Sequence, residues 1–216
     1  MIVNTMTDKE LENELLPEFR SIYKIHGYET SRKWMKEVSK RTIFPIIFKK
    51  TYVSKKKNTY YYYGYFPDRK ARKEGYMGVC VTTMRTNKGI CTFMYAKKSA
   101  EKDYIVMFSP HSVNRLVQRA GAMVTHEEST DEFVRRFAGD SGCYGYEYPN
   151  GDVAFYFKDG VLLGKAVSEH FKIAKTFVDS GRLYEDQLSE SKEACRDFEK
   201  QVADCKALHR QVMKII

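Results

Sequence analysis

The sequence predicts an α+β protein with an antiparallel, twisted sheet, an N-terminal helical pair, two short central helices and a long C-terminal helix. Three observations lead to this class. A helix-capping pattern with helically spaced apolar residues opens the chain, and five runs of β-branched and aromatic residues follow between residues 44 and 108. Asn-Gly and Asp-Gly turns then mark hairpins in the second half. With 216 residues, 43% of them hydrophobic, the chain can bury a substantial core.

The N-terminal helical pair is predicted from caps and apolar spacing. Thr7 and Glu10 form the S/T-x-x-E pattern of a capping box, and apolar residues at helical spacing follow them. We expect Gly27 to end this first helix. A second helix is expected to start near Thr30 and to turn Trp34 toward a partner element.

Two groups of strands are predicted, one before and one after the central helices in the sequence. The first group has lengths that suit an antiparallel meander and comprises residues 44–53, 59–66, 75–84, 89–96 and 103–108. The second group contains four strands between residues 144 and 179, with tight turns at Asn150-Gly151 and Asp159-Gly160.

The chain is expected to consist of three parts. Residues 1–103 hold the N-terminal helices and the first strands, residues 104–182 form an α+β core, and residues 183–216 form a C-terminal helix. The last part has apolar positions three and four residues apart from Tyr184 to Ile216, so we expect it to pack on the core or on a second subunit.

The first central helix has well-marked ends. Ser109 is a suitable N-cap, Pro110 occupies the first helical position, and Gly121 can end the helix. The apolar face consists of Val113, Leu116, Val117 and Ala120. At 100° per residue, His111, Arg115 and Arg119 then form a stripe away from that face, so they must face either water or a ligand cleft. A second helix is expected from Ser129 or Thr130 to Gly139.

The net charge of +9 is concentrated in one segment. Between Arg32 and Lys73 there are fourteen Lys or Arg residues and two acidic residues, with aromatic residues interleaved. Cations that neutralise phosphates, beside rings that stack on bases, suit single-stranded nucleic acid. The candidate contacts are Lys55, Lys56, Lys57, Tyr61, Tyr63, Arg69 and Lys70. The alternative is an edge strand guarded by lysines, with its tyrosines packed inward.

The order of elements between residues 104 and 180 resembles the RelE/BrnT-like toxin ribonuclease superfamily. The chain also resembles an uncharacterised relative in this superfamily, whose helix opens S-x-H-[AS]-x-x-R-[ML]-x-x-R-G. The matching stretch in this sequence is SPHSVNRLVQRAG, from Ser109 to Gly121. It implies metal-independent cleavage of RNA, in which the 2′-hydroxyl attacks the adjacent phosphate, and an antitoxin-like protein partner. Such chemistry needs a base, cations for the developing charge, and an acid for the leaving oxygen.

The resemblance also implies roles for individual residues. His111 would act as base, and Arg115 and Arg119 would contact phosphate oxygens. The remaining candidates lie on the second group of strands: Thr176 for the catalytic site, Lys165 for nucleic-acid contact, and His170 or Tyr156 as acid. If nothing folds over the stripe, the same residues are an ordinary solvated helix face.

Other classes of function find no support in the sequence. Five well-separated cysteines without a C-x-x-C pair favour a reducing compartment over a disulfide framework or a zinc site, and no nucleotide-binding or metal-binding motif is found. We expect a cytoplasmic protein without a cofactor, whose partner is RNA or single-stranded nucleic acid and not a membrane, and which can form a homodimer. Two functions stay open: an endoribonuclease of toxin type, or a non-catalytic nucleic-acid-binding or assembly protein of a mobile element.

Overall fold

The computed structural model describes residues 1–74, 76–97, 102–119, 128–139, 144–157 and 160–183, and five single positions between residues 185 and 200. These ranges contain four α-helices and nine strands. Apart from the five single positions, the long C-terminal helix predicted from Tyr184 to Ile216 lies outside the described residues.

The chain opens with one long helix, α1 (Asp8–Val38, 31 residues), which begins where the sequence predicts. Both bonds of the capping box are present. The Glu10 amide donates to Thr7 Oγ1 at 3.3 Å, and the Thr7 amide donates to Glu10 Oε2 at 2.7 Å. These two bonds satisfy amides that would otherwise lack partners at the helix start.

The prediction of a helical pair with a break at Gly27 was wrong, because α1 continues through that residue. A glycine in a helix interior costs only about 1 kcal/mol. Phe19 and Trp34, on either side of Gly27, are both buried against the same face of the sheet. The free energy gained by burying apolar surface on both halves of the helix therefore exceeds the cost of the glycine between them.

Five strands follow α1 and pair with their neighbours in antiparallel order, as predicted. They are β1 (Ile46–Val53), β2 (Thr59–Phe66), β3 (Met77–Thr86), β4 (Gly89–Lys97) and β5 (Asp103–Phe108), with the short helix α2 (Ala71–Glu74) between β2 and β3. β-Branched and aromatic residues fill the strands, and turn-forming residues occupy the links, so local preference and long-range pairing agree.

The second half of the chain contains two helices and four strands. Helix α3 (Pro110–Arg119) follows β5 directly, and α4 (Glu128–Gly139) starts slightly before the predicted cap. The strands are β6 (Tyr144–Glu147), β7 (Asp152–Phe157), β8 (Gly160–Ala166) and β9 (Phe171–Asp179), followed by the 3-10 turn η1 (Ser180–Arg182). At the predicted β6–β7 turn, Gly151 has a φ of 81°, which glycine adopts at little cost.

All nine strands form a single sheet in the order β1-β2-β3-β4-β5-β9-β8-β7-β6. The two antiparallel groups are joined by one parallel pair, β5 with β9, in which Ile105 lies opposite Phe171 and Phe108 opposite Ala174. The sheet is therefore continuous across the expected boundary between residues 103 and 104.

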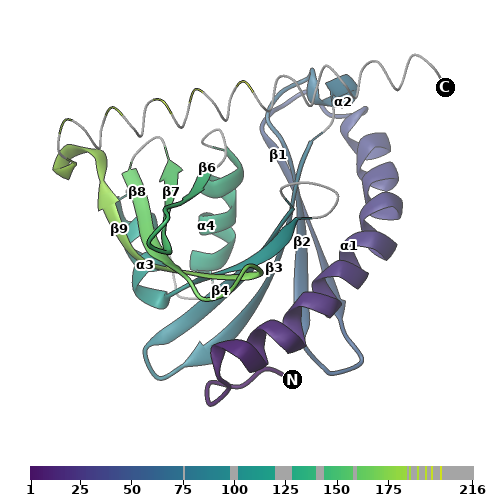
Figure 1. Ribbon diagram of the computed structural model, residues 1–216. Coiled ribbons are helices and arrows are strands. Elements are labelled where there is room, and N and C mark those ends of the chain that lie inside the picture. Colours follow the sequence, from purple (N-terminus) through teal and green to yellow (C-terminus); the bar gives the residue numbers. More distant parts are fainter. Residues whose placement is uncertain are drawn as a thin grey trace.

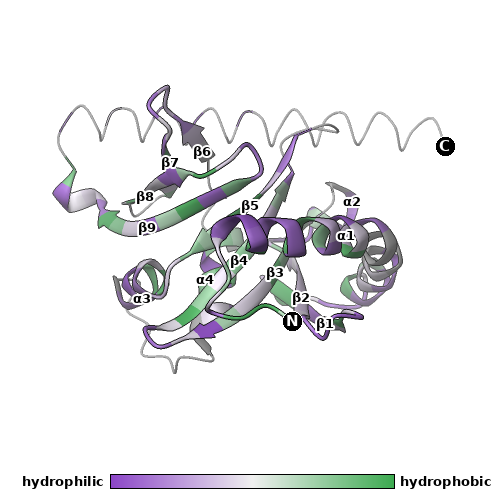
Figure 2. Cartoon of the chain, turned by 60° about the horizontal axis from the view of Figure 1, so that its bottom comes forward, coloured by the Kyte–Doolittle hydropathy of each residue, from purple (hydrophilic) through white to green (hydrophobic). Residues whose placement is uncertain are grey.

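The sheet is curved, and helices pack on both of its faces (Figure 1). The core between α1 and one face contains Phe19, Trp34, Tyr60 and Phe93. A second core, which surrounds α3 and α4, takes side chains from both halves of the sheet; Phe108, Phe133 and Phe155 belong to it. Hydrophilic residues dominate the side of α1 that is visible in Figure 2, as expected for a helix with one buried face.

Strands β8 and β9 change register between Leu163 and Gly164. A Cβ atom at Gly164 would lie 1.8 Å from the Ile173 carbonyl oxygen. Because real Cβ atoms do not approach a backbone oxygen so closely, only glycine allows the two strands to pair at this point.

Gly164→Ala is expected to lower the free energy of unfolding by about 1–3 kcal/mol, since β8 or β9 must shift to admit the methyl group. Urea unfolding followed by circular dichroism measures the loss. Gly181→Ala is the control: its Cβ would meet Asp179 Oδ1 at an ordinary 3.4 Å. Equal stability of the two variants would contradict the close approach.

Candidate functional site

Helix α3 has the buried and exposed faces that its sequence predicts. The buried side chains, which pack in the core around α4, are Val113, Leu116 and Val117. His111 and Arg115 are exposed, one helical turn apart, whereas the side chain of Arg119 lies outside the described residues. The first two members of the stripe therefore stand together on the surface.

Two serines fix the start of α3 on strand β9. The Ser112 amide donates to Ser109 Oγ at 3.2 Å, which is the predicted N-cap bond. The Ser109 amide donates to the Ala174 carbonyl, and its hydroxyl donates to the Lys175 carbonyl, both at 3.1 Å. The buried Ser112 hydroxyl also lies 3.2 Å from the Ala174 carbonyl. The backbone of His111, between these serines, is thus held firmly.

Thr176 and Lys165 lie on the opposite face of the sheet from α3. Thr176 precedes Phe177, whose side chain packs in the core around α3 and α4. Because side chains alternate along a strand, Thr176 points the other way. Lys165 pairs with Ile173, which belongs to the core under α1. Paired residues share a face, so Lys165 also points away from α3.

Tyr156, one of the two candidate acids, also faces away from α3. Its neighbours in β7, Phe155 and Phe157, pack in the core around α3 and α4. The Tyr156 side chain instead packs in a small separate cluster, and its hydroxyl lies 2.7 Å from the hydroxyl of Tyr148. The sheet therefore separates Tyr156 from the stripe.

His170, the other candidate acid, belongs to a polar network that fastens α1 to β5. Its Nδ1 lies 2.7 Å from the Asp103 carbonyl oxygen. The Asp103 carboxylate accepts two bonds of 2.7 Å from the Arg20 guanidinium and one of 2.7 Å from the Tyr95 hydroxyl. These bonds, those of Arg20 above all, lower the pKa of Asp103 to about 2. Since α3 starts beyond the other end of β5, His170 is a strand length away from His111.

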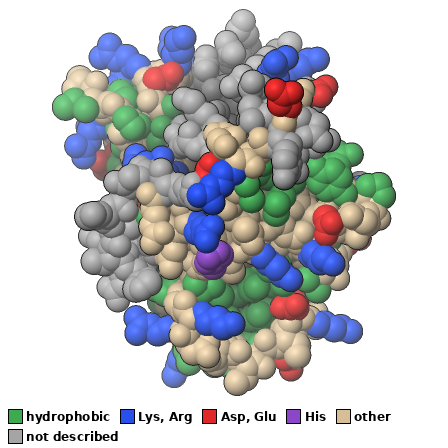
Figure 3. All heavy atoms as spheres, turned by 90° about the vertical axis from the view of Figure 1, so that its left-hand side faces the viewer, with side chains coloured by type: hydrophobic (Ala, Val, Ile, Leu, Met, Phe, Trp, Pro, Cys, Tyr) green, Lys and Arg blue, Asp and Glu red, His purple; other side chains and the backbone are tan. Residues whose placement is uncertain are grey.

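The proposed catalytic residues are therefore not brought together. Cleavage of RNA requires a base, a cation and an acid within reach of the same phosphate. Of the catalytic candidates whose side chains are described, only His111 and Arg115 share one surface. Among the described residues on the face in Figure 3, Lys and Arg side chains are interspersed with acidic and apolar ones.

The basic segment from Arg32 to Lys73 lies mostly on the surface. Thirteen of its fourteen cationic side chains are exposed, and that of Arg72 is partly buried. Within the described part of the chain, two of the fourteen pair with carboxylates: Lys49 with Asp131 at 2.7 Å, and Lys56 with Glu14 at 2.5 Å. The others lie at the β1–β2 turn, on β1, along the second half of α1, and around α2.

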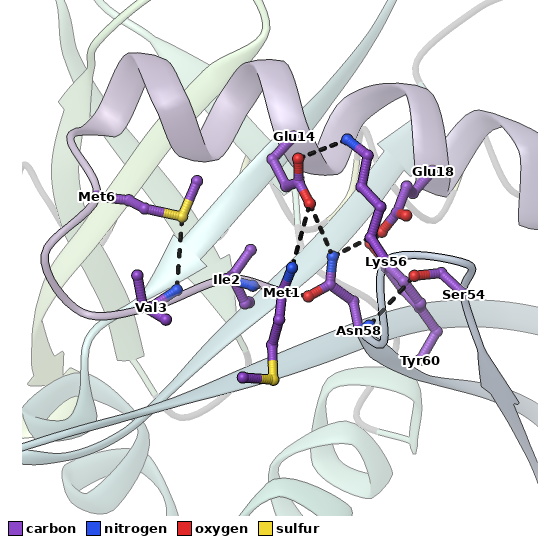
Figure 4. A network of polar contacts seen from close by, with 10 residues as sticks. All are labelled: Met1, Ile2, Val3, Met6, Glu14, Glu18, Ser54, Lys56, Asn58 and Tyr60. Atoms are coloured by element: carbon purple, nitrogen blue, oxygen red, sulfur yellow. Dashed lines mark hydrogen bonds and ion pairs between the residues drawn. The ribbon is translucent and has the colours of Figure 1, made fainter.

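Asn58 holds the β1–β2 turn against α1 (Figure 4). Its buried side chain accepts a bond from the Ile2 amide at 2.7 Å and donates to Glu14 at 3.3 Å and to Glu18 at 2.8 Å. The ion pair between Lys56 and Glu14 strengthens the same attachment. Lys56, predicted as a nucleic-acid contact, is therefore engaged by the fold.

Its two neighbours at the turn, Lys55 and Lys57, are exposed, and we call them the turn cluster. Lys57 has a φ of 62°, which places it at the tight bend. Neither ammonium group forms an ion pair with another described residue.

A second group of cations surrounds the end of α1. The Arg72 guanidinium donates to the Val38 carbonyl at 3.1 Å and to the Arg41 carbonyl, so these bonds fasten α2 to the end of α1 and the residues after it. Figure 1 shows α2 beside this last turn. The exposed cations here, which we call the α2 cluster, are Lys40, Arg41, Arg69, Lys70 and Lys73.

The tyrosines of β2 are mostly core residues, as the alternative interpretation of the basic segment predicts. Tyr60 and Tyr62 pack under α1. Tyr63 is 3% exposed and donates a hydrogen bond to Asp131 of α4; burial and this bond raise its pKa. Tyr61 is partly exposed, with Lys49 Nζ 4.6 Å from its ring centroid. Of the two predicted contacts, Tyr61 can reach a base and Tyr63 cannot.

Sequence reasoning missed two parts of this surface. The sequence places Lys40 and Arg41 in the basic segment, but it does not predict that they lie near Arg69 and Lys70. No local sequence pattern indicates that α2 packs on the end of α1. The exposed apolar residues of β1 were also missed. Their alternation with partly buried residues follows from the strand pattern, but the position of β1 at the edge of the sheet does not.

Asp103→Asn is expected to lower the free energy of unfolding by roughly 1–2 kcal/mol at neutral pH. Because folding depresses the pKa of Asp103, its stabilisation is complete above the ordinary value of 3.8 and is lost as the pH falls to about 2. Thermal melts across this range should show a steeper loss for the wild type than for the variant. Glu169→Gln, at an exposed position, is the control; parallel profiles for wild type and Asp103→Asn would contradict the network.

Asn58→Ala is expected to lower the free energy of unfolding by about 1–3 kcal/mol, since the Ile2 amide and Glu18 lose a buried partner. Urea unfolding measures the change, and the exposed Asn87→Ala is the control. A stability loss no larger than that of the control would show that Asn58 does not anchor the turn.

Two general findings concern the described residues. No helix among them combines the length and apolar character needed to cross a lipid bilayer. They also lack any group of three or more His, Cys, Asp or Glu side chains that could hold a metal ion.

Comparison with protein-family models, with curated proteins and with solved structures finds no match to this chain.

Proposed function

We propose that this protein binds nucleic acid through phosphate contacts made by the turn cluster and the α2 cluster, and that it does not cleave it. One observation carries the proposal. Seven exposed cations of a single segment lie at the two ends of the β1–β2 hairpin, and no described carboxylate forms an ion pair with them, whereas Lys49 and Lys56 are paired. Unpaired surface cations attract a polyanion, because each phosphate contact releases condensed counterions. RNA is the partner that the toxin-ribonuclease resemblance favours.

The geometry favours binding over cleavage. His111 and Arg115 form an exposed pair on α3, and this pair is the observation that supports the endoribonuclease of toxin type as a second candidate. The other proposed members lie across the sheet or at its opposite end, so neither candidate acid faces the pair. A phosphate held at His111 would therefore lack His170 or Tyr156 as the donor for its leaving oxygen.

Lys55→Gln/Arg69→Gln is expected to weaken binding of a single-stranded RNA and to reduce the slope of log K against log salt by about 0.7 for each lost phosphate contact. Fluorescence anisotropy at several salt concentrations measures both quantities. Lys88→Gln/Lys175→Gln removes two exposed charges elsewhere and is the matched control. Binding that ignores salt, or that falls equally in the control, would refute the proposal.

The same RNA should stay intact when incubated with purified protein in chelator-containing buffer. His111→Ala and Arg115→Ala should bind it as the wild type does. If the wild type cleaves the RNA and His111→Ala does not, the endoribonuclease assignment replaces this proposal.

A further inference from the structure

Strand β1 exposes one of its two faces. β1 is the first strand of the sheet, so one of its edges has no neighbouring strand among the described residues. Its residues Ile46, Phe48 and Tyr52 pack against the core under α1. The alternate residues point to the other face and are all exposed; we call Ile47, Lys49, Thr51 and Val53 the β1 strip.

The β1 strip carries no free charge and has an apolar residue at each end. Ile47 is 37% exposed and Val53 is 68% exposed. Lys49 forms an ion pair with Asp131 at 2.7 Å and covers the ring of Tyr61. Tyr61 lies on the neighbouring strand β2, directly opposite Thr51 of the strip. The strip therefore offers methyl groups and part of an aromatic ring, not free charge, to whatever binds there.

Free charge lies beyond the two ends of the strip. The turn cluster follows Val53 directly. At the other end, Ile46 pairs with Phe66, the residue after which the chain enters the segment that carries Arg69, Lys70 and α2. The eight residues of β1 separate these ends by roughly 26 Å at about 3.3 Å per residue.

We propose that a single strand of nucleic acid lies along the β1 strip, with bases against Ile47, Val53 and the Tyr61 ring and with phosphates at the turn cluster and the α2 cluster. This inference rests on the proposed function and specifies its substrate class. In a duplex the bases stack inside the helix and the phosphates lie outside, so the apolar residues of the strip would gain nothing. An unpaired strand can instead place its bases on apolar and aromatic side chains.

The edge of β1 supports the same occupant. Its outward backbone amides and carbonyls can hydrogen-bond to the edges of unpaired bases. Pairing of β1 with β1 of a second copy is the competing use of this edge. Antiparallel pairing about the middle of the strand would bring Lys50 of one copy close to Lys50 of the other, and like charges on adjacent strands are unfavourable. A polyanion removes this repulsion, so charge complementarity favours nucleic acid.

A neutral double variant tests the inference. Ile47→Thr/Val53→Thr keeps β-branched side chains and net charge but removes apolar surface from the strip. The matched control is Leu163→Thr/Val167→Thr, which changes residues of 42% and 46% exposure on and after β8. Thermal melts establish that both variants fold. The probes are a fluorescein-labelled oligouridylate of about 12 nucleotides, within the usual range of single-strand sites, and a blunt RNA duplex of equal length.

The wild type and the control are expected to bind the single strand at least about fivefold more tightly than the duplex at the same salt concentration, in line with the contribution of one base contact. In Ile47→Thr/Val53→Thr this ratio should fall toward one while duplex binding stays unchanged.

Two results would overturn the inference and leave the proposed function intact: equal affinity of the wild type for both probes, or an unchanged ratio in Ile47→Thr/Val53→Thr. A sedimentation experiment covers the competing occupant, because loss of a dimer in that variant without loss of RNA affinity would assign the strip to a second copy. Absence of binding to either probe would refute the proposed function itself.

Discussion

The parallel pairing of β5 with β9 is the constraint on which the rest of the structure depends. Without it, the chain would contain two separate antiparallel sheets, each with an unprotected edge. The same pairing brings the carbonyls of residues 174 and 175 to the end of β5, where Ser109 and Ser112 bind them and fix the direction of α3. Helix α4 then reaches β1 and β2 through Asp131, so one junction sets the position of both central helices.

This arrangement separates the two candidate sites. The stripe of α3 lies next to the junction, whereas the β1–β2 hairpin lies at the far edge of the sheet. The sheet stands between the stripe and the side chains of Thr176, Lys165 and Tyr156, because side chains alternate between its two faces. Chemistry that needs those groups together is therefore geometrically excluded in the described chain, while charge-based binding at the hairpin needs no such assembly. Asn58 and Lys56 fasten that hairpin to α1 and keep its turn cluster exposed.

Local features of the fold were predictable, and non-local ones were not. The capping box at Thr7, the cap at Ser109 and the strand segments depend on neighbours in sequence, and they are confirmed. The break at Gly27 was wrong because distant burial decided it. The parallel pair joins segments more than sixty residues apart, which no periodicity reports.

In the candidate site, too, the local features were predictable and the non-local ones were not. The exposure of His111 and Arg115 follows from helical geometry and is confirmed. The face of Thr176 depends on a register shift at Gly164, and a shift of one residue moves a side chain to the other side of a sheet. Tyr61 and Tyr63 share a face, yet only α4 decides which of them is covered.

Photo-crosslinking with an RNA that carries 4-thiouridine, followed by mass spectrometry of the crosslinked peptides, tests the central claim most directly. If nucleic acid binds along the β1–β2 hairpin, the crosslinks should lie in residues 46–57 and at Tyr61. Crosslinks confined to residues 110–119 of α3, with none on the hairpin, would contradict it.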